Sequence, residues 1–160
     1  MISEKINLIK EIEQLQELIA IKEQQLNIPF LTDFNQIPVI YKWFLNISEN
    51  LNQPYQVGNV IHRKKFLFII LLLYSPGTLI GKPMLRGLRD KLAKTLKLSS
   101  RSTISDNCAN LIIYYNSFKE YRNDIDLVYQ QLFDQIQAVL WDSGKLKATH
   151  KKGIEKVLNE

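Results

Sequence analysis

Apolar residues recur at helical spacing along most of the chain, and the pattern is clearest at the start. Over residues 3–27 the apolar positions alternate four- and three-residue steps, the heptad pattern of a helix that pairs with another helix. Ile falls at the a positions and Leu at the d positions, with Lys22 taking one place in the series. The apolar members are Leu8, Ile12, Leu15, Ile19 and Leu26.

The N-terminal segment, residues 1–28, leaves two arrangements open. Ile at a with Leu at d favours a parallel two-stranded coiled coil, and so a homodimer. Further apolar residues widen the stripe, as expected of a helix that packs on its own domain. They are Ile2, Ile6, Ile9, Leu18 and Ile21.

Two more helices are predicted before residue 75. One covers residues 37–51 after a break bracketed by Pro29 and Pro38. The other begins at Asn59, a good N-cap, and contains the apolar run of residues 66–74. Nine residues fall far short of the roughly 20 that span a bilayer, so we expect a buried helix and no membrane association. The basic run at its start, residues 63–65, is expected to be a solvated first turn.

Residues 85–118 are predicted to form two helices joined at a corner at residues 99–102. Ser100 or Ser102 is the expected cap of the second helix. Its apolar residues follow one face, and its polar residues point away from it. The first helix carries Leu85, Leu88, Leu92, Ala93 and Leu96; the second buries Ile104, Cys108, Leu111, Ile112 and Tyr115 and presents Thr103, Asp106, Asn107 and Asn110.

The rest of the chain is also predicted to be helical. Ser117 and Glu120 have capping-box spacing, which indicates a helix start there. That helix is expected to stop at residues 142–144 and to be followed by a basic tail helix over residues 145–160. Nothing alternates with strand period over a useful length. The fold class is therefore all-α: an N-terminal heptad helix, a helical domain over residues 37–142 and the tail.

The positive charge lies in the middle of the chain. Residues 61–118 hold ten Lys and Arg against two Asp, a net charge of +8, whereas residues 1–60 carry −3 and residues 119–160 carry zero. Such a segment is typical of a surface that binds a polyanion.

Residues 88–111 resemble the helix-turn-helix superfamily of DNA-binding proteins, whose members commonly read LA-x-x-L-G-L-S-x-x-T-V-S. Leu92-Ala93, Leu96, Leu98-Ser99 and residues 103–105 match this pattern. Lys97 stands where a corner glycine is usual, and the corner is one residue longer than the commonest form. A wider set of residues is similar to uncharacterised small proteins of bacterial phages and mobile elements: Tyr74-Ser-Pro76, Gly81, Gly87-Leu-Arg89 and Tyr121-Arg-Asn-Asp124.

The resemblance implies that the helix from residue 102 enters the major groove of duplex DNA. Asn107 and Asn110 would then bond adenine, Thr103 a thymine methyl group or a phosphate, and Arg101 guanine or the backbone. Asp106 would repel phosphate unless it accepts from cytosine or pairs with Arg101. The candidate DNA-binding residues are Lys82, Arg86, Arg89, Lys94, Ser100, Arg101, Thr103, Asn107 and Asn110.

Residues for catalysis or metal binding are few. With two histidines and one cysteine, the chain offers no zinc signature and no paired catalytic side chains, so we expect a non-enzymatic protein without catalytic, metal or cofactor sites. Cys108 cannot form an internal disulfide, and no signal peptide is recognisable, which favours a cytoplasmic location.

Two functions follow from the sequence. One is a DNA-binding regulator or accessory factor of a phage or mobile element. The other is a helical protein-interaction or structural module that uses the N-terminal helix and binds no nucleic acid.

Overall fold

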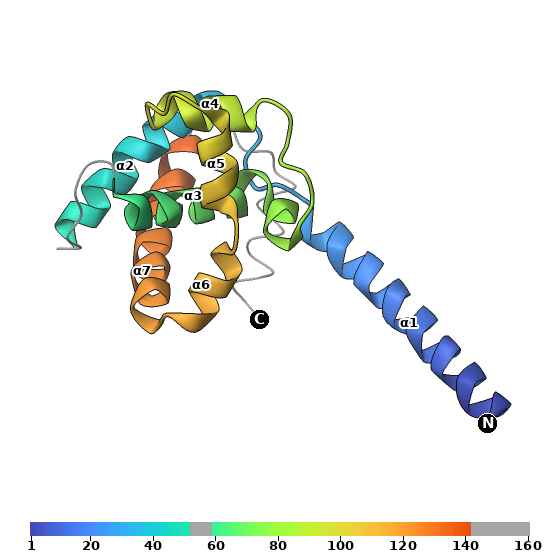
Figure 1. Ribbon diagram of the computed structural model, residues 1–160. Coiled ribbons are helices and arrows are strands. Elements are labelled where there is room, and N and C mark those ends of the chain that lie inside the picture. Colours follow the sequence, from blue (N-terminus) through green and yellow to red (C-terminus); the bar gives the residue numbers. More distant parts are fainter. Residues whose placement is uncertain (52–58, 142–160) are drawn as a thin grey trace.

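The computed structural model describes residues 1–51 and 59–141, and these residues form helices and connecting turns without a strand. The all-α prediction is confirmed. The helices from α2 onward form one body, and α1 extends from it as a single arm (Figure 1). The predicted tail helix lies outside the described residues.

The helix α3 (Val60–Tyr74) is the centre of this body. Nine of its residues are buried, including the whole run Phe66–Leu71. The Asn59 side chain caps it by accepting from the backbone N–H groups of Ile61 and His62, as predicted. A helix that is apolar all round must be enclosed by others, and α2, α5 and α7 pack against it.

Two longer helices enclose α3. The helix α2 (Ile37–Asn50) buries four apolar residues at helical spacing, and α7 (Lys119–Ile136) buries five. They pack against each other as well as against α3. Their buried apolar residues are Ile37, Ile40, Phe44 and Ile47 on α2, and Tyr121, Ile125, Val128, Leu132 and Ile136 on α7.

Short elements complete the body. The helix α4 (Leu88–Thr95) packs on α2 and on α5 (Arg101–Cys108), and α6 (Leu111–Ser117) packs on α7. The 3₁₀ turns are η1 (Phe34–Gln36) and η2 (Pro76–Ile80), and a π-helical turn, η3 (Gln137–Trp141), follows α7.

The helix α1 (Ile2–Leu26) has no buried residue. Among the described residues, only its C-terminal end meets the domain, where Glu23 pairs with Lys82 at 3.1 Å and the Asn27 side chain occupies the space left by the missing side chain of Gly77. Of the two arrangements that the sequence left open, packing of α1 on its own domain is not observed for the described residues. The helix itself is confirmed.

Two boundaries differ from the predictions. The helix expected from residue 102 through Tyr115 is broken, because Asn110 adopts a left-handed conformation (φ 62°) between α5 and α6. The capping box is also wrong: Ser117 is the last residue of α6, and α7 begins at Lys119 with Phe118 as its N-cap and no side-chain capping bond. Among the described residues, no helix is long and apolar enough to cross a membrane.

Candidate nucleic-acid interface

The corner between α4 and α5 is closed by backbone hydrogen bonds. The Leu98 N–H donates to the Ala93 carbonyl at 2.8 Å, and the Lys97 N–H donates to the Lys94 carbonyl at 3.2 Å. This pair of bonds is the Schellman motif, which ends a helix and turns the chain sharply. Leu98 is half-buried against the core, and an apolar contact of the residue at this position frequently accompanies the motif.

Lys97 occupies the left-handed position of that motif, with φ 54°. Glycine is the usual residue there because a side chain is strained in this conformation. The lysine that departs from the family pattern therefore adopts the backbone conformation that the pattern's glycine would adopt. Its side chain is exposed and adds a cation to the corner.

The start of α5 is held by two side-chain interactions. Ser100 is the N-cap, and its hydroxyl accepts from the Ser102 N–H at 3.2 Å, which confirms one of the two predicted caps. Arg101 reaches back to Asp90 on α4 at 3.2 Å. The pair is largely exposed, so it fixes the position of the guanidinium more than it stabilises the fold.

Several predicted phosphate-binding cations do surround α4. Arg86 precedes the helix, and Arg89 and Lys94 lie on it, all three exposed. Lys91 and Lys97 extend this group, and we refer to Arg86, Arg89, Lys91, Lys94, Lys97 and Arg101 together as the corner cations. From residue 86 to residue 101 the only carboxylate is Asp90.

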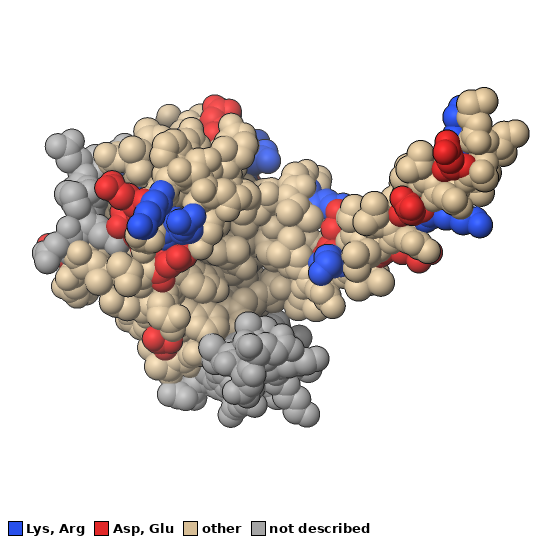
Figure 2. All heavy atoms as spheres, turned by 90° about the horizontal axis from the view of Figure 1, so that it is seen from below, with Lys and Arg blue, Asp and Glu red and all other residues tan. Residues whose placement is uncertain are grey.

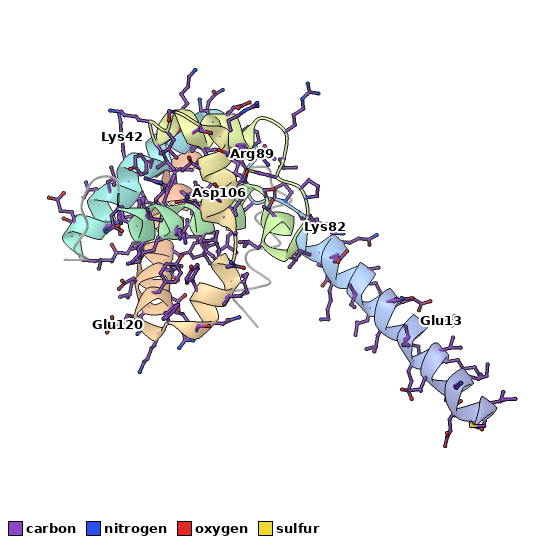
Figure 3. The ribbon with its side chains drawn as sticks, viewed as in Figure 1. Glu13, Lys42, Lys82, Arg89, Asp106 and Glu120 are labelled. Atoms are coloured by element: carbon purple, nitrogen blue, oxygen red, sulfur yellow. The ribbon has the colours of Figure 1, made fainter. Side chains whose placement is uncertain are left out.

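Lys82 does not belong to this group. It lies at the base of α1, away from Arg89 and the α4 end of the molecule (Figure 3), where it pairs with Glu23. Arg86 is not on the helix that the sequence predicted from residue 85, because α4 begins only at Leu88.

Asn107 points inward, contrary to the prediction. It is only 8% exposed; its amide N–H donates to the Thr103 carbonyl at 2.7 Å, and its amide oxygen accepts from Arg63 on α3 at 3.4 Å. A side chain held in this way cannot bond a base edge. Asn107 therefore links α5 to the central helix.

The exposed face of α5 differs from the predicted one. Thr103 is half-buried, and Asn110 is exposed but lies in the break after α5 rather than on it. Arg101, Ser102 and Asp106 are exposed, with Ser105 half-buried beside them. Ser102 and Ser105 were not among the polar residues predicted to point away from the core, because the sequence was interpreted as one continuous helix through Tyr115.

The basic run at the start of α3 was expected to be solvated, and it is not. Lys65 bonds Asp124 on α7 at 2.6 Å, and Lys64 lies over the Tyr114 ring of α6 at 4.5 Å from its centre. With the Arg63 bond to Asn107, three successive cations join α3 to three other helices. They contribute to the fold, whereas all the corner cations are exposed except Lys91, which is half-buried and donates to the Asn35 side chain at 3.3 Å.

The opposite side of the molecule has mixed charge. Figure 2 shows the face away from α4, where lysine and arginine lie close to aspartate and glutamate on the body and along α1. A surface of this kind has no strong net field, since neighbouring charges cancel. This face therefore offers no concentrated positive charge to a polyanion.

Cys108 is the one cysteine of the chain, and it is half-buried. Burial raises the pKa of the Cys108 thiol to about 11, which keeps it protonated and weakly nucleophilic at neutral pH. Among the described residues, no three His, Cys, Asp or Glu side chains gather where they could hold a metal ion.

The comparisons with known proteins add no relative to this picture. No protein family, curated protein or solved structure matches the chain.

Proposed function

We propose that the protein binds duplex DNA through the corner formed by α4 and the start of α5, as an accessory or regulatory factor of a phage or mobile element. The observation that carries this proposal is the set of six corner cations, which outnumber the two carboxylates beside them, Asp90 on α4 and Asp33 in the hollow that Lys91 and Lys94 line. Neutralising phosphates releases condensed counterions, and this supplies most of the affinity of such surfaces.

The start of α5 supports the same proposal. Backbone N–H groups at a helix N-terminus favour a nearby anion, and Arg101 stands at that end. The polar side chains exposed on α5 are few and include Asp106, which repels phosphate. The proposed binding is therefore dominated by contacts with the DNA backbone, with limited reading of base edges.

Salt-dependent binding tests the proposal. Affinity for a duplex is measured by fluorescence anisotropy at several salt concentrations for the wild type and for the double variant Arg86→Ala, Lys94→Ala. A plot of log affinity against log salt concentration has a negative slope, and each lost phosphate contact reduces the magnitude of that slope by about 0.9. The magnitude should therefore be smaller by about 2 for the double variant than for the wild type.

The matched control is Lys10→Ala, Lys119→Ala, which removes the same charge from exposed positions on α1 and α7. Its slope should equal that of the wild type. Equal losses in both variants would mean attraction by net charge alone. No binding at low salt would overturn the proposal and favour the protein-interaction role.

A further inference from the structure

The helix α1 carries an apolar stripe that nothing in the described chain covers. Ten large apolar side chains along it are between 37% and 81% exposed. A lone helix of this kind is only marginally stable in water, because helices in proteins depend mostly on packing of their apolar face. The stripe therefore needs a partner.

We propose that this partner is α1 of a second copy of the chain, and that the two helices form a parallel two-stranded coiled coil. The inference does not depend on DNA binding. It rests on the heptad order, in which Ile12 and Ile19 occupy a positions and Leu8 and Leu15 occupy d positions. β-Branched residues at a with leucine at d select two parallel strands.

The area available is sufficient for such a dimer. Eight of the ten exposed apolar residues fall at a, d, e or g positions and would be covered by the second helix. If the exposed half of a leucine or isoleucine is taken as roughly 80 Å², they contribute about 600 Å² per helix. Both helices together then bury about 1,200 Å², the lower end of the range for stable complexes, before the stems of polar side chains are counted.

The flanking charges are compatible with this pairing. In the parallel register Glu11 lies opposite Gln16 of the second copy, and Leu18 lies opposite Glu23, so these positions bring no like charges together. Lys5 and Lys22 are the unfavourable residues, because they take an a and a d position, where each meets its own counterpart in the second copy. Replacing either should strengthen the dimer.

The first experiment is sedimentation equilibrium of the full chain. The wild type should be a dimer that dissociates on dilution. Ile12→Asn combined with Ile19→Asn should be monomeric, whereas the matched control Lys10→Asn with Glu17→Asn, at f positions on the opposite side of α1, should remain dimeric. Because α1 has no buried residue, the domain should stay folded in both variants, which urea unfolding checks. Lys22→Leu should lower the dimer Kd by about tenfold.

The orientation is tested by disulfide formation in a Cys108→Ser background. In a parallel coil each Ile12 faces its own counterpart, so Ile12→Cys alone should form a cross-linked dimer. In an aligned antiparallel coil Ile12 faces Leu15, and only a mixture of Ile12→Cys and Leu15→Cys chains would cross-link efficiently. That result would overturn the parallel arrangement. A monomeric wild type at all concentrations, or a larger oligomer, would overturn the two-stranded pairing itself.

Discussion

The helices α1 and α3 are both rich in leucine and isoleucine, yet they stand at opposite extremes of burial. None of the 25 residues of α1 is buried, whereas nine of the 15 residues of α3 are. Polar side chains differ in the same way: those of α1 are exposed except for the half-buried Glu23, while the cations at the start of α3 are half-buried and engaged by other helices.

The difference shows what a hydrophobic pattern determines. A helix that is apolar all round, such as α3, can be satisfied only inside a bundle, and one chain supplies the surrounding helices. A helix with one apolar stripe, such as α1, needs a partner on one side only, and that partner can belong to another molecule.

The largest effect should come from matched truncations in the two helices. Leu71→Ala in α3 removes a fully buried side chain and should lower the free energy of unfolding by about 2–5 kcal/mol. Leu15→Ala in α1 makes the same chemical change at an exposed position and should alter it by less than about 0.5 kcal/mol. Urea unfolding of the domain at concentrations where α1 is unpaired measures both. Similar losses in the two variants would contradict the contrast.

His62, in the first turn of α3, should make stability depend on pH. Burial, and secondarily the charge of Lys65, lowers its pKa from 6.5 to about 4. Between these values the unfolded chain binds more protons than the folded one, so the contribution is complete above about pH 6.5 and is lost as pH falls through about 4. The expected loss is on the order of 3 kcal/mol.

The measurement is urea unfolding from pH 7.5 to pH 4 for the wild type and His62→Gln. The carboxylates are common to both proteins, so the difference between the two curves isolates His62. It should be constant above about pH 6.5 and shrink below it. Parallel curves over the whole range would show that His62 titrates normally in the folded protein.

Replacing one lysine in each of the two helices should change the free energy of unfolding by different but smaller amounts. Lys65→Ala leaves Asp124 without its 2.6 Å bond and should cost about 1–2 kcal/mol, because a bond to a charged group is lost from a half-buried site. Lys10→Ala on α1 removes an exposed lysine and should change stability by less than about 0.5 kcal/mol. Thermal unfolding of the two variants compares them directly.

Much of the fold could be predicted because local signals were strong. The Asn59 cap and the apolar run of residues 66–74 located α3 and its burial, and the heptad pattern located α1. The break at Asn110 could not be predicted in this way, since it involves neither glycine nor proline. Asparagine tolerates a left-handed conformation, but it does so only where the surrounding packing requires it.

The candidate site was predicted in part. The exposed cations on and around α4 follow from the charge pattern, because lysine and arginine on a short surface helix remain in water. The orientation of Asn107 could not be predicted, because it depends on Arg63, 44 residues earlier in the chain. The end of α5 at Cys108 then sets which side of that helix faces solvent, and this side is not the one inferred from an unbroken helix.

The left-handed Lys97 makes the corner a balance between strain and charge. A lysine in that conformation costs roughly 1–2 kcal/mol that a glycine would avoid. It also follows the carbonyl end of α4, where the negative pole of the helix dipole attracts a cation by about 0.3–1 kcal/mol. The attraction offsets only part of the strain. The corner therefore gains an exposed positive charge at a net cost in stability, and a glycine at this position should make the fold more stable while removing that charge.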